Sequence, residues 1–201
     1  LSLTPSFDLW VSVKTKITKT TDNGIIGTSA GSVNQIALYT YVTNFWSEIG
    51  SSATNNYTNN SATNICTSTF FTIGALINRT SNLTSFVNGV VKTNTGITNL
   101  GKNILTNPLQ IGRIWMGYLQ GQIATVQIIR FDNIALTDFN PNTYQPGMVI
   151  NDLGGGNPEV VLHLDPKDGS SIANMLKDYS PKGHTITAVN IDLSNRVVVR
   201  N

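Results

Sequence analysis

Short segments of alternating apolar and polar residues, separated by Gly, Asn and Pro, constrain the fold of this chain most strongly. Strands that recur at such short spacing are typical of an all-β sandwich or barrel and argue against βαβ units. The pattern predicts strands at residues 7–14, 35–42, 70–78, 83–92, 109–112 and 122–131, and in the tail at 159–165, 184–191 and 196–200.

The first segment shows the alternation most clearly. Leu9, Val11 and Val13 fall on one face, whereas Trp10 shares the other face with polar neighbours such as Ser12. This predicts a half-buried strand with Trp10 on its polar side.

Two further segments carry specific turn or loop signals. Apolar residues flank Asn88-Gly89, which is the strongest short-range signal for a type I′ hairpin. Residues 50–64 are dominated by Asn, Thr and Ser, and this low complexity predicts a long exposed loop.

The turn-rich stretch 141–158 contains three consecutive glycines and predicts a boundary near residue 147. We therefore expect a sandwich at 1–147 and a C-terminal extension at 148–201 that packs on the sandwich or completes it. A short helix capped by Ser170 or Ser171 is expected in the extension.

Four motifs support a more specific interpretation. In chain order they are Phe86-Val87-Asn88-Gly89-Val90-Val91, Leu109-Gln110-Ile111-Gly112-Arg113, Gly121-Gln122-Ile123-Ala124-Thr125-Val126-Gln127-Ile128, and Arg130-Phe131 leading to Ala135-Leu136-Thr137. Together they resemble the laminin-G-like, concanavalin A-like lectin jelly rolls. The resemblance covers residues 7–140 and implies two stacked antiparallel sheets, one of them concave. The family includes glycan binders, adhesion modules, domains appended to enzymes, and phage tail or capsid appendages.

One phrase departs from the family order. Members often begin with a strand followed by Asp-x-Ser-Gly-x-Gly, whereas here a similar phrase runs from Asp178 to His184, after Leu162–Asp165. The tail is therefore expected to complete the sheet in permuted order, to form an added layer, or to begin a neighbouring domain. Similar tails in phage fibre-like proteins favour a virion origin, by analogy.

The composition argues against several function classes. Charged residues make up 12% of the chain, its net charge is +2, and Lys and Arg do not cluster, so we expect no nucleic-acid partner. No run reaches the roughly 18 apolar residues of a membrane span, so we expect no membrane insertion. Cys66 is the single cysteine, which excludes an internal disulfide; we expect it to be a small buried residue.

The sequence also argues against catalysis. Retaining glycosidases need two carboxyl groups about 5 Å apart, but Glu48 and Glu159 are the only glutamates and lie far apart in the chain. No Gly-x-Ser-x-Gly elbow is present. His163 alternates with leucines and is expected on the outer face of a strand. We therefore predict that the protein is not an enzyme.

We expect no cofactor. Calcium is the one metal worth considering, because lectin-like sandwiches often bind it through Asp side chains at a sheet edge. Asp132 and Asp138 are the candidate ligands, and a purely turn-forming role is the alternative.

Glycan binding requires an aromatic platform beside hydrogen-bonding groups. The candidates are Trp10, Trp46, Tyr57, Trp115 and Tyr118. Trp115 and Tyr118 lie between two predicted strands, where rim loops project; the alternative is packing under a loop or against another subunit. Tyr39 and Tyr41 are expected in the core.

These features predict a non-enzymatic, lectin-like module on a virion or extracellular surface, either attaching to glycans or decorating a particle. Its partners would be glycans or other virion or cell-surface proteins, and we expect a homo-oligomer. The alternatives are a carbohydrate-active enzyme or its carbohydrate-binding module, and a purely structural assembly protein.

Overall fold

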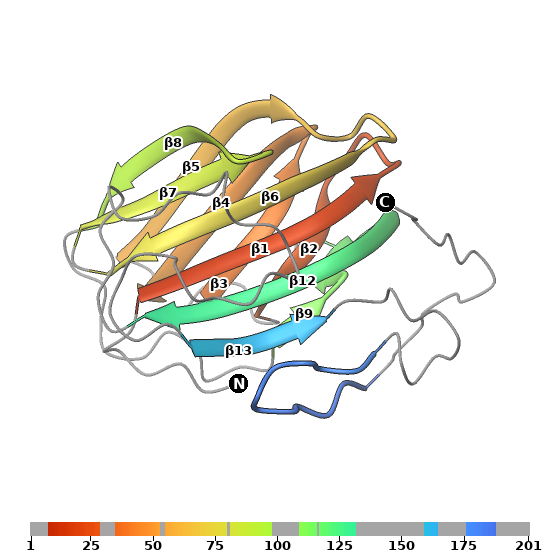
Figure 1. Ribbon diagram of the computed structural model, residues 1–201. Coiled ribbons are helices and arrows are strands. Elements are labelled where there is room, and N and C mark those ends of the chain that lie inside the picture. The colour runs from red at the N-terminus through yellow and green to blue at the C-terminus, as the bar shows by residue number, and fades with distance from the viewer. Residues whose placement is uncertain are drawn as a thin grey trace.

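The structure, a computed structural model, describes residues 8–28, 35–52, 55–79, 81–97, 109–115, 117–131, 159–164 and 176–187 (Figure 1). Every regular element among them is a β-strand, and none of them forms a helix able to cross a membrane. The strands are β1 (Asp8–Ile17), β2 (Asn23–Thr28), β3 (Gln35–Tyr41), β4 (Asn44–Ser52), β5 (Asn55–Asn64), β6 (Phe70–Asn78), β7 (Asn82–Val87), β8 (Val90–Gly96), β9 (Leu109–Ile111), β10 (Arg113–Ile114), β11 (Gly117–Tyr118), β12 (Gly121–Phe131) and β13 (Glu159–Leu164).

The strands form two large antiparallel sheets. The six-stranded sheet has the order β13-β12-β1-β6-β7-β8, and the five-stranded sheet has the order β5-β4-β3-β2-β9. Figure 1 shows the two sheets stacked face to face. Strands β10 and β11 pair with each other as a separate hairpin. The all-β, two-sheet antiparallel sandwich predicted from the sequence is confirmed.

The core lies between the two sheets. It contains Leu9, Val11 and Val13 of β1 together with Leu38 of β3 and Phe45 of β4, each at most 1% exposed. Burial of one such side chain stabilises the folded state by roughly 1.5–3 kcal/mol. The inward-facing alternate residues of both sheets therefore hold the sandwich together.

The prediction that β1 is half-buried is wrong, because its second face is buried as well. Trp10 is 2% exposed and meets the Phe86 ring edge to face, with a centroid distance of 5.2 Å. Asp8 is buried too and accepts a 2.9 Å hydrogen bond from the backbone amide of Arg79. The alternation of polar and apolar residues predicts which side chains share a face of the strand. It does not predict whether other parts of the protein cover that face.

The prediction of an exposed loop at residues 50–64 is also wrong, because residues 55–64 form β5 at the edge of the five-stranded sheet. Asn59 explains why so polar a segment is ordered. Its side chain is 1% exposed and donates a 2.6 Å hydrogen bond to the backbone carbonyl of Leu83 in β7, and it accepts one from the Thr95 hydroxyl in β8. Polar side chains thus join the edges of the two sheets.

The predicted hairpin at Asn88-Gly89 is confirmed. Asn88 and Gly89 join β7 to β8 with φ angles of 50° and 76°, the two positive values that a type I′ turn requires. The Asn88 side chain also accepts a 2.9 Å hydrogen bond from the backbone amide of Thr72 in β6.

Two described segments of the tail lie next to each other, one of them against β12. Strand β13 pairs with β12 and forms an edge of the six-stranded sheet, and Asp178 forms an isolated antiparallel bridge with Leu164. Residues 184–187, predicted to begin a strand, form none. The boundary near residue 147, the helix after Ser170 or Ser171 and the strand at 196–200 lie outside the described residues.

Asp178 organises the segment 176–187. Its side chain is fully buried and accepts hydrogen bonds from the backbone amides of His163, Ser180 and His184 at 2.8–3.0 Å. The Ser180 hydroxyl and Nδ1 of His184 also approach this carboxylate, at 2.9 and 2.7 Å. Burial alone would raise the pKa of Asp178, but the hydrogen bonds outweigh it and lower the pKa to about 2.

Candidate functional site: an aromatic pocket on the five-stranded sheet

The outer face of the five-stranded sheet carries a group of aromatic side chains. Because Leu38 and Phe45 face the core, the alternate residues Tyr39 of β3 and Trp46 of β4 face outward. Tyr39 and Trp46 are direct cross-strand partners, and their rings lie nearly parallel, at 14°, with a centroid distance of 6.3 Å. The antiparallel register therefore brings the two rings together.

The hairpin of β10 and β11 adds a third ring from above β2. Ile114 is 3% exposed and packs with Ala37 and Tyr39, which fixes the hairpin on the sheet. Trp115, in the turn of the hairpin, lies with its ring centroid 5.8 Å from that of Tyr39. Trp115 is 45% exposed and forms a wall of the site.

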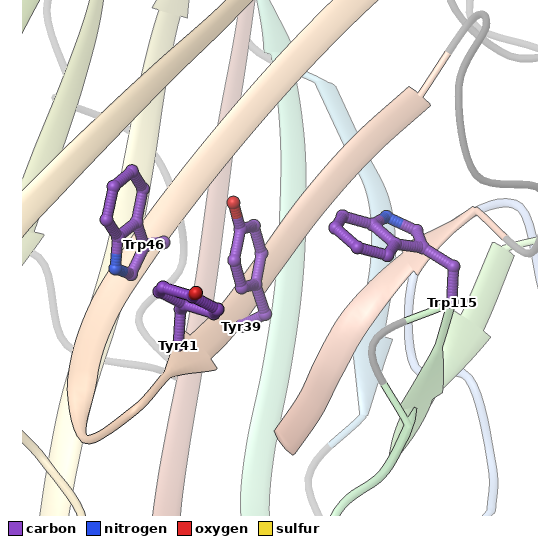
Figure 2. Close-up of a pocket in the computed structure, with 4 residues that line it drawn as sticks. All are labelled: Tyr39, Tyr41, Trp46 and Trp115. Atoms are coloured by element: carbon purple, nitrogen blue, oxygen red, sulfur yellow. The ribbon is translucent and has the colours of Figure 1, made fainter. Parts of the chain in front are cut away.

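These rings and Tyr41 line an open pocket of about 280 Å³. Figure 2 shows Trp46 and Tyr39 standing on neighbouring strands, Tyr41 crosswise beside them, and Trp115 on the far side of Tyr39. Tyr41 is 51% exposed, and its ring is nearly perpendicular to that of Trp46, at 88°. The pocket thus presents aromatic surface at several angles, which suits a ligand with apolar ring faces.

A buried carboxylate on the same face of the sheet holds Tyr39 in place. The Tyr39 hydroxyl donates a 3.2 Å hydrogen bond to Oε2 of Glu48, which is 4% exposed. Burial raises the pKa of the Tyr39 phenol far above its ordinary value, and the Glu48 carboxylate raises it further. Tyr39 therefore remains a neutral hydrogen-bond donor throughout the physiological range, locked in place by Glu48.

No protein-family model matches the sequence, and no curated protein matches it. Solved structures do. A putative carbohydrate binding protein from Bacteroides ovatus ATCC 8483 is similar with a TM-score of 0.64 at 14% identity, over 90% of this chain and 51% of that chain. Domains LG4-5 of the mouse laminin alpha1 chain are similar with a TM-score of 0.52 at 12% identity, over 63% of this chain and 36% of that chain. The chain has the laminin-G-like, concanavalin A-like jelly-roll fold.

The CBM40 domain of the Ruminococcus gnavus IT-sialidase has the same fold, with a TM-score of 0.52 at 11% identity, over 69% of this chain and 83% of that chain. The resemblance drawn from the hairpin and strand motifs is therefore confirmed for the fold. The chain spans about half the length of the Bacteroides structure and about a third of the laminin structure. At these identities the likeness concerns the laminin-G-like fold alone.

On this jelly roll, the predicted ligand-binding residues occupy different places. Trp46 and Trp115 line the pocket. Tyr118 lies on the same hairpin as Trp115 and is 56% exposed, but it stacks under the Arg113 guanidinium, 4.9 Å away, and does not line the pocket. Tyr57 is half-buried against the core, and Trp10 is buried in the other sheet. The structure therefore leaves Trp10 and Tyr57 out of the candidate site.

Sequence reasoning assigned Tyr39 and Tyr41 to the core. Tyr39 is buried, at 5% exposed, in a small cluster with Ala37 and Ile114 outside the core between the sheets, whereas Tyr41 is 51% exposed, so the prediction is wrong for Tyr41. Both point away from the core and line the pocket. A signal was present in the sequence: the two tyrosines are two positions apart, and the Val42-Thr43 turn brings Trp46 back beside them.

Metal binding finds no support among the described residues, which contain no group of three or more His, Cys, Asp or Glu side chains able to hold an ion. The predicted calcium ligands, Asp132 and Asp138, lie outside the described residues.

Proposed function

We propose that this protein is a non-enzymatic carbohydrate-recognition module. The observation that carries the proposal is the open pocket lined by Tyr39, Tyr41, Trp46 and Trp115. The apolar faces of sugar rings stack on aromatic rings, and ring hydroxyl groups bond to nearby amides and phenols. The pocket offers both, because Tyr41, which is 51% exposed, combines a ring face with a hydroxyl.

Two of the solved structures with this fold support the proposal, since one is described as a putative carbohydrate binding protein and the other is a CBM40 domain. The placement of the two glutamates favours binding over hydrolysis. Glu48 lies on the five-stranded sheet, hydrogen-bonded to Tyr39, whereas Glu159 belongs to the other sheet and pairs with Arg130 at 2.7 Å. They cannot flank one glycosidic bond.

We further propose an extracellular or virion surface as the place of action, with glycans or surface proteins as partners and self-association into a homo-oligomer. The low charge and the tail phrase around Asp178 support the virion setting by analogy alone. A structural assembly role is the second candidate. It is favoured by the exposed side chains of Tyr118, Val90 and Val91, 47–56% exposed and outside the pocket.

A glycan array followed by titration calorimetry on the best ligand tests the proposal. Trp115→Ala removes a pocket wall and should weaken binding by at least about tenfold, a loss typical of an aromatic contact residue. Tyr118→Ala is the matched control, because Tyr118 is an exposed aromatic of the same hairpin; it should change affinity by less than about twofold.

Three outcomes would contradict carbohydrate recognition at this pocket: no array signal, unchanged binding by Trp115→Ala, or equal losses in both variants. Light scattering on the same samples measures the oligomeric state. A stable oligomer that binds no glycan would favour the assembly role.

A further inference from the structure

We infer that the pocket takes the terminal unit of a glycan chain and excludes internal segments of a longer chain. This inference rests on the proposed carbohydrate recognition. It follows from the placement of the β10–β11 hairpin, which closes one end of the aromatic row and leaves the other end open.

At the closed end, the backbone of the hairpin lies directly against the backbone of β2. A Cβ atom added at Gly24 of β2 would lie 2.4 Å from the amide nitrogen of Ile114 and 2.6 Å from the carbonyl oxygen of Gly117. Gly27, farther along β2, allows a similar approach by the Ile114 side chain, at 2.8 Å. These two glycines form a seat for the hairpin. A ligand extending from β4 across β3 therefore meets the hairpin above β2.

The hairpin is also fixed at both of its ends. The backbone amide of Gly112, just before β10, donates a 2.7 Å hydrogen bond to the carbonyl of Ile25 in β2. The amide of Gln120, just after β11, donates a 3.0 Å hydrogen bond to the Asn23 side chain, which is fully buried. These two hydrogen bonds, together with the packing of Ile114, hold the hairpin and its Trp115 in place on β2.

The opposite end of the row continues over polar residues. Trp46 pairs in register with Asn60 of β5, and Glu48 pairs with Thr58. Asn60 and Thr58 are exposed and lie on the same outer face as Trp46. An amide and a hydroxyl at this position suit the hydroxyl groups of a second sugar. The terminal unit thus lies against Trp115, and the rest of the chain leaves over β5.

The first experiment uses the unaltered protein and two probes. The best linear oligosaccharide from the array, attached through one end, is compared with the same oligosaccharide extended by one sugar on its free end. Terminal recognition should weaken binding of the extended probe by at least about tenfold, because the added unit collides with the hairpin. Equal affinity for both probes would overturn the inference while carbohydrate recognition stands. Binding to neither would overturn the proposed function itself.

A second experiment changes the wall. Gly24→Ala places a methyl group where the hairpin backbone lies, so the preference for the unextended probe should fall from about tenfold towards equality. Gly96→Ala in β8 is the matched control, because its nearest contact would be 3.9 Å away, and it should keep the full preference. An unchanged preference in Gly24→Ala would contradict the role of the hairpin as the end wall.

Discussion

At the scale of single residues, Asp178 shows how one buried carboxylate can organise a segment that has almost no secondary structure. Five donors converge on its two oxygens, three of them backbone amides. An acceptor used this fully is hard to replace, because each donor left unpaired in a buried position is costly. The family-like phrase from Asp178 to His184 is therefore the sequence signature of a hydrogen-bonded loop.

Asp178→Asn should lower the free energy of unfolding by about 2 kcal/mol near neutral pH, since it removes the charge and part of the accepting capacity. The pKa of Asp178 is lowered from 3.8 to about 2 in the folded state. Its stabilising contribution is therefore present above pH 3.8 and is lost as the pH falls towards 2. Urea unfolding at pH 6 and pH 2.5 should show the gap between wild type and variant narrowing at the lower pH.

Asp22→Asn is the control, because the Asp22 side chain accepts one hydrogen bond, at 2.9 Å from the Val42 amide. Its effect should stay below about 1 kcal/mol. A gap between wild type and Asp178→Asn that is the same at both pH values would show that ionisation of Asp178 does not stabilise the fold.

The aromatic residues differ in how well their place in the candidate site can be predicted from the sequence. Trp46 and Trp115 could be predicted as pocket residues, because they occur among polar or loop-forming neighbours. Tyr39 and Tyr41 are harder to predict, since aromatic residues on a strand look the same whether the outer face is covered or open, and the turn that returns Trp46 beside them is the one signal. Trp10 has the same alternation pattern as an outward-facing residue, yet it is 2% exposed.

At the scale of elements, β1 and β6 fit together because Gly74 leaves room for Trp10. A Cβ atom at Gly74 would lie 2.5 Å from Cη2 of the Trp10 indole and 3.0 Å from the carbonyl oxygen of Val11. The Trp10 indole therefore fits on the six-stranded sheet because Gly74, in the neighbouring strand β6, has no side chain.

Gly74→Ala should destabilise the protein by about 1–3 kcal/mol, the usual range for an overpacked site. The ring cannot move freely, because it also packs edge to face on Phe86. Gly96→Ala, in a strand of the same sheet with space for a methyl group, should change stability by less than about 1 kcal/mol. Thermal unfolding of both variants measures the difference, and equal midpoints would refute this account of the Trp10 site.

Elements differed in how well the sequence predicted them. The Asn88-Gly89 hairpin was predictable because its turn imposes φ angles that few residues tolerate. Strand β5 was not, because Asn and Thr disfavour an apolar core position, and the Asn59 side chain is ordered by hydrogen bonds to the Leu83 backbone carbonyl of β7 and the Thr95 hydroxyl of β8. Propensity is local, whereas the bonds that order β5 join residues 24 and 36 positions apart.

At the scale of the whole molecule, β5 and β8 hold the two sheets together along one edge with polar contacts. Asn59 of β5 bonds the Leu83 carbonyl and the Thr95 hydroxyl, and the Thr93 hydroxyl donates a 3.0 Å hydrogen bond to the carbonyl of Asn60. These contacts connect the sheet that carries the pocket to the opposite sheet.

A double-mutant cycle tests this connection. Asn59→Ala should lower the free energy of unfolding by about 2 kcal/mol, because it leaves the buried Leu83 carbonyl without this donor. Thr95→Val replaces the hydroxyl group with a methyl group of similar size. The two changes should couple by about 1 kcal/mol, and a coupling energy near zero would show that the two side chains stabilise the edge independently.

The β10–β11 hairpin, which rests on Gly24 and Gly27 of β2, shapes the pocket, whereas the two large sheets and the core between them determine the fold. Strands β10 and β11 rest on the outer surface of the sandwich through Ile114, and they belong to neither large sheet. Exchanging this hairpin for one of another length would leave the core untouched while moving or removing the wall that carries Trp115. In a lineage of such proteins, preference for new ligands could arise from short insertions at this hairpin, with Gly24 and Gly27 retained as the platform.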